Sequence, residues 1–160
     1  MIVIVGESAS GKGTLARSIV EKSKDLKLVV TYTTRPPRDG EIDGIDYHFV
    51  RDECFEQMIK DCKFVEYTTY RGWYYGTAAS DCLSEKSVVV LNPTGLRAVK
   101  RIGYEVTSIY LNVDRRSRLI KMLNRGDNIE EAYRRSLSDE GQFAEIGRET
   151  TAVLDNPKYQ

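Results

Sequence analysis

The sequence lacks the features that mark several classes of protein. Its 160 residues carry no net charge, because 24 Lys and Arg balance 24 Asp and Glu, so no overall basic field favours nucleic acid or an anionic membrane surface. No apolar run approaches the roughly 20 residues of a membrane-spanning helix, and no basic leader with an apolar segment follows Met1. These absences predict a soluble, cytoplasmic chain that binds neither nucleic acid nor membrane.

Cysteine and histidine are scarce as well. Cys54, Cys62 and Cys82 are odd in number and follow no CxxC or Cys/His metal spacing, which favours reduced thiols over a disulfide framework. His48 is the only histidine and has no triad-like partners nearby in the sequence, so we expect it to pack or to lie on the surface. A chain of this length can still bury a core without disulfides or structural metals, and we expect one compact domain.

Short apolar runs separated by helical patterns indicate an α/β fold. Residues 2–5 form a continuous Ile-Val-Ile-Val run that ends at Gly6, which is typical of a strand buried on both faces of a parallel sheet. Further β-branched runs of this kind follow at residues 28–30, 87–91 and 106–111. Apolar pairs three or four residues apart lie between the runs and predict crossover helices, which parallel strands require.

A stretch of different character interrupts this pattern. Between residues 33 and 77, short strands punctuated by Tyr and Gly surround a helix near residues 52–60. We therefore predict a single α/β domain with a parallel-sheet core at residues 1–32 and 78–160. A small mixed subdomain is expected to be inserted into that core at residues 33–77.

A glycine-rich loop, Gly-Glu-Ser-Ala-Ser-Gly-Lys-Gly-Thr, joins the first strand to a helix. In such a loop, successive backbone N–H groups and a helix N-terminus surround a triphosphate, and Lys12 would lie along its β- and γ-phosphates. The general pattern has Ser or Thr directly after the lysine to hold Mg²⁺, whereas here Gly13 stands there and Thr14 follows. This ending resembles the loops of adenylate and cytidylate kinases. We therefore expect Thr14 to supply the hydroxyl group, while Mg²⁺ is bound largely through water and phosphate oxygens. The predicted ATP-binding residues are Gly6, Ser8, Ala9, Ser10, Gly11, Lys12, Gly13 and Thr14.

A second phosphate site is predicted by the run Thr-Thr-Arg-Pro-Pro-Arg-Asp-Gly at residues 33–40. Arg35 and Arg38 bracket two prolines that stiffen the backbone, so two guanidinium groups are held in a fixed relation suited to a phosphate. Turns then lead the chain back toward Tyr47. With the loop at Gly6 and the Tyr-Tyr-Gly-Thr run that ends at Thr77, this run resembles the guanylate kinase family over residues 2–137.

The resemblance implies an acceptor site for a nucleoside monophosphate. The phosphate would be held by Arg35, Arg38, Tyr47 and Tyr75. Thr31, Glu66 and Thr77 would face the base. Guanine presents N1–H and an exocyclic NH₂ as adjacent donors, which the single carboxylate of Glu66 can accept together. Asn92 stands where the family usually has Asp, so an acceptor oxygen is kept and a charge is lost. The predicted GMP-binding residues are Thr31, Arg35, Arg38, Tyr47, Glu66, Tyr75, Thr77 and Asn92.

Residues 115–137 contain seven Lys or Arg residues against three acidic ones and resemble the family's lid, whose arginines close over the phosphates. A solvated, charge-rich pair of helices is the alternative. Ser136 falls where a second lid arginine is usual, which leaves two arginines slightly out of register as candidates. The predicted catalytic residues are Lys12, Lys121, Arg125, Arg134 and Arg135.

Together these features predict transfer of a phosphoryl group from ATP to GMP or dGMP, with Mg²⁺ as the cofactor and a monomer or small homo-oligomer as the working form. One alternative is a kinase of another nucleoside monophosphate, which the loop ending and Asn92 suggest. The other is a catalytically silent binding module that grips an acidic or phosphorylated partner. Lys12 argues against the silent module, because such a module does not need an intact ATP loop.

Overall fold

The computed structural model describes residues 1–70, 72–81 and 84–157, and its principal sheet follows the apolar runs of the sequence. In spatial order this sheet contains β2 (Lys27–Leu28), β7 (Ser87–Val90), β1 (Ile2–Gly6), β8 (Thr107–Asn112) and β9 (Ala152–Asp155). All four neighbouring pairs are parallel. The predicted parallel-sheet core is therefore confirmed, with β9 as an edge strand that the sequence did not predict.

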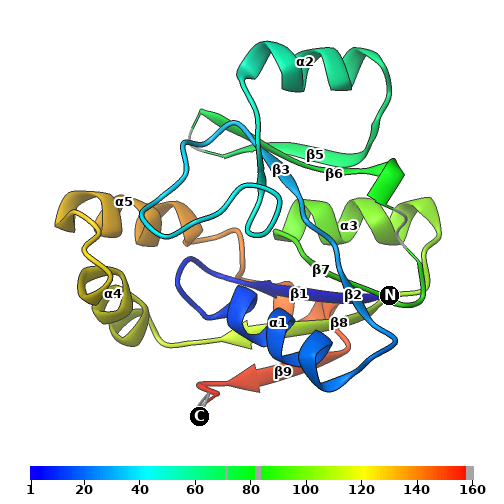
Figure 1. Cartoon of the computed structure of the whole chain (residues 1–160). Helices are drawn as coiled ribbons and strands as arrows, with labels where there is room; N and C mark the ends of the chain where they lie inside the picture. Colours follow the sequence, from blue (N-terminus) through cyan, green and yellow to red (C-terminus); the bar gives the residue numbers. More distant parts are fainter. Residues whose placement is uncertain (71, 82–83, 158–160) are drawn as a thin grey trace.

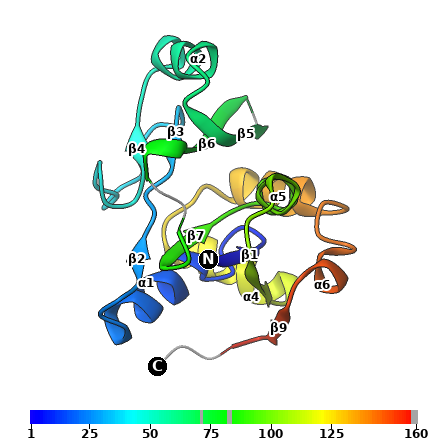
Figure 2. The same ribbon diagram turned by 90° about the vertical axis from the view of Figure 1, so that its right-hand side faces the viewer.

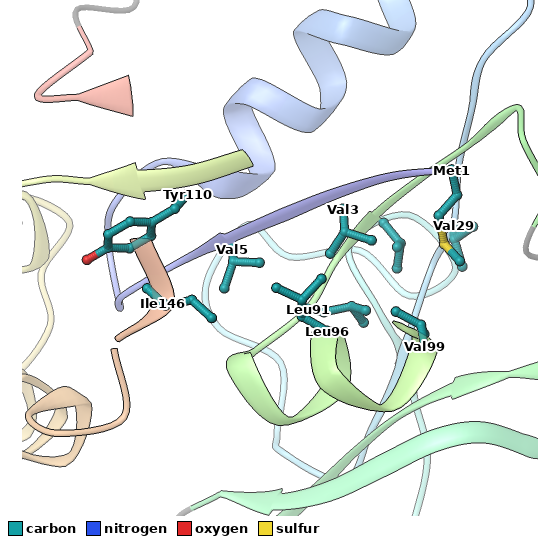
Figure 3. Packing of buried hydrophobic residues seen from close by; sticks show 10 residues of the cluster. Met1, Val3, Val5, Val29, Leu91, Leu96, Val99, Tyr110 and Ile146 are labelled. Atoms are coloured by element: carbon teal, nitrogen blue, oxygen red, sulfur yellow. The ribbon is translucent and has the colours of Figure 1, made fainter. Parts of the chain in front are cut away.

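Helices cover both faces of this sheet (Figure 1): α1 (Lys12–Lys22) packs on one face, and α3 (Pro93–Ile102) and the short α6 (Ile146–Glu149) pack on the other. Two more helices, α4 (Arg115–Asn124) and α5 (Ile129–Asp139), lie beyond the ends of the strands. On one face, Val3 and Val5 of β1 pack with Leu96 of α3, as Figure 3 shows. On the other face, Ile4 packs with Ala16 of α1. Because β1 is buried on both sides, its residues form the unbroken apolar run seen in the sequence.

A second, mixed sheet holds the middle of the chain. Its spatial order is β4 (His48–Phe49), β3 (Tyr32–Thr33), β6 (Trp73–Ala78) and β5 (Phe64–Tyr70), with α2 (Asp52–Lys60) against it and a 3₁₀ turn at Ala79–Asp81 beyond it. The β3/β4 pair is parallel, whereas β6 pairs antiparallel with both β3 and β5. Figure 2 shows this sheet and α2 above the principal sheet, to which the chain connects them.

The second sheet packs on aromatic rings. Phe55 of α2 stacks between Phe64 and Tyr74, with ring centroids 4.3 and 5.1 Å away. Gly76 lies against this stack, and a β-carbon there would come within 2.9 Å of both phenylalanine rings. Only glycine allows this close approach, and the neighbouring Tyr75 and Thr77 are thereby fixed on β6.

Two helices at the left of Figure 1, α4 and α5, begin with side-chain caps. Asp114 accepts the Ser117 N–H at 2.9 Å, and Asn128 accepts the Glu130 N–H at 2.8 Å, which satisfies backbone donors that a helix start leaves unpaired. No helix among the described residues is long and apolar enough to cross a bilayer. Cys54 and Cys62 are exposed free thiols, while Cys82 lies outside the described residues.

Candidate active site

The loop between β1 and α1 has the backbone geometry of an anion cradle. Ala9 and Gly11 have positive φ angles of 62° and 94°, and the Ser10 N–H donates to the Glu7 carbonyl at 3.2 Å. A β-carbon on Gly6 would lie 2.6 Å from the Ser10 hydroxyl and 3.1 Å from the Leu111 carbonyl oxygen, so glycine leaves the room that this turn needs. Left-handed residues within such a turn produce the concave row of N–H groups that binds anions.

Lys12 lies beside this loop as a desolvated cation. Its Nζ donates to the Glu7 carbonyl at 2.7 Å. Burial lowers its pKa to about 8, although the charges of Asp139 and Glu7 act in the opposite direction. A buried ammonium with a lowered pKa gains strongly from an added anion, so the environment of Lys12 favours phosphate binding.

Glu41 fixes the two arginines of the 33–40 run. The Arg35 Nη2 donates to both Glu41 oxygens at 2.9 Å, and the Arg38 backbone N–H donates to Glu41 at 2.7 Å. The Arg35 guanidinium also lies over the Tyr47 ring, 5.4 Å from its centroid, and Tyr47 meets Tyr75 edge to face. The arginines and tyrosines of the predicted phosphate site are thus brought together.

Arg38 is the most electrostatically crowded of these cations. Burial lowers its pKa, and the charges of Arg35, Arg135 and Arg125 lower it further. Its Nε is buried and has no hydrogen-bond partner among the described residues. Guanidinium groups from the 33–40 run and from residues 125–135 therefore lie near one another with a donor left over, an arrangement that a phosphate would stabilise.

The predicted base side centres on Glu66 of β5, which is 8% exposed. The Thr77 hydroxyl donates to its Oε1 at 2.6 Å. Burial raises the pKa of Glu66, and the hydrogen bonds from Thr77 oppose that shift. Gly95 leaves room for the second oxygen, since a β-carbon there would lie 3.0 Å from Oε2. Asn92 caps α3 by accepting the Gly95 N–H at 2.8 Å, so its oxygen is engaged and its amide group is the side that remains for a ligand.

Acidic partners hold the two arginines of the predicted lid that line the cavity, Arg125 and Arg135. Arg135 is 8% exposed and donates to Asp127 at 3.1 Å and to Glu131 at 2.9 Å, and Arg125 also pairs with Asp127. Burial would raise the pKa of Asp127, but the hydrogen bond and charge of Arg125 and the charges of Arg135 and Arg38 keep it below its usual range. Both arginines are thereby held at the cavity.

A single cavity of about 210 Å³ joins these groups. Thirteen of the residues predicted from the sequence line it: Gly6, Ser8, Ala9, Lys12, Thr31, Arg35, Arg38, Tyr47, Glu66, Tyr75, Asn92, Arg125 and Arg135. Thr77 lies directly behind Glu66. The remaining predicted residues are not among those that line the cavity: Ser10, Gly11, Gly13, Thr14, Lys121 and Arg134.

Three of these off-cavity residues lie at the surface. Lys121 is exposed on α4, and Arg134 is exposed on α5, where it pairs with Glu130 at 3.3 Å. Thr14 is exposed in the first turn of α1. Their assignment to the site stays a prediction, and Arg135 is the one of the two adjacent arginines that lines the cavity.

Several lining residues were not predicted from the sequence. Thr68, Tyr70 and Trp73 come from the β5/β6 hairpin, and Asp139 and Phe143 come from the end of α5 and the turn after it. The hairpin aromatics could have been predicted, because they are close in sequence to Tyr75. Nothing in the sequence marks Asp139, because its place at the cavity depends on how α5 packs against the loop after β1.

The fold and this two-sided cavity define a P-loop kinase that acts on nucleotides. A family model described as guanylate kinase matches residues 1–159. The chain therefore belongs to the guanylate kinase family, as its resemblance predicted.

Relatives support this placement. A guanylate kinase from Prochlorococcus marinus subsp. pastoris is 38% identical over 144 residues, which cover 86% of this chain and 78% of the relative. One from Nostoc sp. is 36% identical over 166 residues and spans 100% of this chain and 83% of its own length. The crystal structure of guanylate kinase from Anaplasma phagocytophilum matches with a TM-score of 0.67 at 22% identity and covers 98% of this chain and 77% of that one, which shows the fold.

Proposed function

We propose that this chain transfers the γ-phosphoryl group of ATP to GMP or dGMP. The main support for the proposal is that one cavity is lined by groups suited to both substrates. These groups are Lys12 of the glycine-rich loop, Arg38 of the 33–40 run and the buried carboxylate of Glu66. A donor phosphate site and an acceptor phosphate site that open into one small space allow in-line transfer between two bound nucleotides.

On the donor side, the loop of residues 6–14 would hold the ATP phosphates through its backbone N–H groups, with Lys12 beside the β- and γ-phosphates. The charge on the transferring group shifts toward the β–γ bridge during transfer. Lys12 and Arg135, both at the cavity, are the cations suited to stabilise that charge, with Arg125 at its more exposed edge.

On the acceptor side, Arg35, Arg38, Tyr47 and Tyr75 would orient the GMP phosphate, whose oxygen is the attacking group. A nucleotide phosphate is already ionised near neutral pH, so the protein does not need a general base. Thr31, Glu66, Thr77 and Asn92 would recognise the base, with Glu66 as the acceptor for two guanine donors. Such recognition requires the ionised carboxylate, whose pKa burial raises.

Mg²⁺ fits the donor side as an ion held mainly by nucleotide and water. No cluster of three or more metal-binding side chains was found among the described residues, and Mg²⁺ commonly keeps several waters while binding phosphate oxygens. We propose that the Thr14 hydroxyl, exposed beside the loop, contacts this ion directly or through water. The bound ion would neutralise phosphate charge during transfer.

The working parts of the molecule follow from this assignment. We propose a core at residues 1–32 and 78–160, an acceptor subdomain at residues 33–77 and a lid at residues 115–137 that closes over the phosphates. Lys121 and Arg134 would have to approach the nucleotides by such closure. The reaction uses small nucleotides, and we propose that it runs in the cytoplasm in a monomer or a small homo-oligomer.

An ADP-release assay with GMP, dGMP, AMP, CMP, UMP and TMP tests the proposal. We expect GMP and dGMP to be the preferred acceptors. Lys12→Ala should lower kcat by about 10² or more, the scale of a lost charge-stabilising group, whereas Lys22→Ala removes the same charge from the exposed end of α1 and should leave kcat unchanged. Preference for another monophosphate would identify the alternative kinase, and no turnover in a well-folded wild type would identify the silent module.

A further inference from the structure

A carboxylate from α5 reaches the glycine-rich loop. Asp139, the last residue of α5, is 6% exposed, and its Oδ2 accepts the Ser8 N–H at 2.8 Å. The Ser8 hydroxyl lies 3.4 Å from the other carboxylate oxygen. A backbone N–H of the loop that would bind phosphate therefore already donates to an anion supplied by the chain itself.

Asp139 belongs to the charge balance of the cavity. It lines the cavity together with Lys12 and Ser8, and its charge favours the protonated form of Lys12. On its other side, the buried Arg118 guanidinium approaches it at 3.4 Å, while the Nε of that arginine donates to the Val113 carbonyl at 3.0 Å. Asp139 is thus a buried carboxylate, held between the Ser8 N–H and the Arg118 guanidinium, and not a loose surface side chain.

A nucleotide phosphate would meet this carboxylate directly. An amide N–H has one hydrogen to donate, so Ser8 cannot fully serve Asp139 and a phosphate oxygen at the same time. Two anions a few ångströms apart in a partly desolvated site also repel each other. Either the carboxylate withdraws when a phosphate chain arrives, or a cation must lie between the two anions.

We propose that Asp139 is a resident anion of the donor phosphate site, which ties the end of α5 to the loop through Ser8 and is displaced when a nucleoside di- or triphosphate binds. The proposal rests on the proposed function, because it takes the loop of residues 6–14 as the ATP site. It adds a residue that weakens donor binding by competition and that must move for the site to fill.

The test is the Asp139→Asn variant, which keeps the shape and an acceptor oxygen for Ser8 and removes the charge. Binding of ADP and ATP is measured by calorimetry without Mg²⁺, where the ion cannot mask repulsion. Both dissociation constants should fall by about fivefold to fiftyfold, as expected for removal of a nearby like charge in a partly screened site. The dissociation constant for GMP should change by less than about threefold, because GMP is held by a separate set of cations.

Glu140→Gln is the matched control, since it removes the neighbouring negative charge from an exposed side chain that pairs with Arg115 at 2.5 Å. It should change ADP affinity by less than about twofold, as is usual for exposed charges. Unchanged or weaker ADP binding in Asp139→Asn would overturn the proposal. Weaker binding only when Mg²⁺ is present would overturn it too, because Asp139 would then hold the hydrated ion.

A second variant and a hydrogen-exchange measurement test the displacement of Asp139 independently. Asp139→Ala, checked by thermal melting, should show the same gain in ADP affinity. In the wild type, saturating ADP should speed amide hydrogen exchange at residues 137–142, because the tether is released, and slower or unchanged exchange there would contradict displacement. If the wild type binds neither ADP nor ATP and Lys12→Ala changes nothing, the proposed function fails instead.

Discussion

The exchange of Glu66 for Gln separates base recognition from structural support. The wild-type carboxylate accepts the Thr77 hydroxyl through Oε1, and its Oε2 lies beside Gly95. Gln keeps the size of the side chain and one acceptor oxygen, which Thr77 can still use. The other position becomes an NH₂ that must face a guanine donor or turn away from its partner.

The magnitude follows from the burial of this group. A desolvated polar group left mispaired costs about 1–3 kcal/mol, and each 1.4 kcal/mol is about a factor of ten. The ratio of kcat/KM for GMP to that for AMP should therefore fall by roughly one to two powers of ten. Adenine offers a single donor on the corresponding edge, so AMP should lose less than GMP.

The same exchange should lower GMP discrimination without lowering the stability of the fold. Burial raises the pKa of Glu66. The stability contributed by a carboxyl with a raised pKa is fully present below its unfolded pKa and is lost as the pH rises through its folded pKa. Ionisation of Glu66 therefore weakens the fold, and at pH 7 Glu66→Gln should melt at the same or a higher temperature than the wild type.

Steady-state kinetics with GMP and AMP, together with thermal melting at pH 7, measure both effects. Glu56→Gln removes the same charge from an exposed position on α2 and should leave kinetics and melting unchanged. A lower melting temperature with an unchanged GMP/AMP ratio would refute the reasoning, because Glu66 would then be a structural strand residue.

Two further changes test the neighbouring groups. Arg38→Ala should raise KM for GMP by about tenfold or more, the scale of a lost charge-assisted pair, and leave KM for ATP within about twofold; the reverse pattern in initial-rate kinetics would mean that the two phosphate sites are exchanged. Asn92→Asp places a second carboxylate beside Gly95, close to Glu66, and like charges raise each other's pKa. The acid limb of kcat/KM for GMP should thus move to higher pH, and an unshifted pH profile would show that the two side chains do not interact.

Much of the fold could be predicted because its strongest signals are local. The run at residues 2–5 is apolar throughout, since β1 is covered by helices on both faces. The edge strand β9 was not predicted. Its four residues, Ala-Val-Leu-Asp, contain only three apolar residues in a row and are all exposed, and the strand is defined by its pairing with β8.

Residues that line the cavity could be predicted where one short motif holds them together. The adjacent Arg134 and Arg135 show the limit, because successive helix positions point about 100° apart and a small shift of register exchanges their roles. Only the packing of α5 turns Arg135 to the cavity and leaves Arg134 at the surface with Glu130. Asp139 was missed for a related reason, since its partner Ser8 is 131 residues away in the sequence.

The carboxylates of the site differ in how easily a phosphate can replace them. Glu41 holds Arg35 through two hydrogen bonds of 2.9 Å, and both side chains are little exposed, so this pair would be a fixed support for the proposed acceptor site. Asp127 holds Arg125, whose side chain is 45% exposed, and exposed ion pairs contribute little to stability. A nucleotide would therefore take Arg125 from its partner at small cost while Arg35 stays in place. Asp139 lies between these cases: it is buried, yet its partner Ser8 belongs to the loop that we propose binds the ATP phosphates.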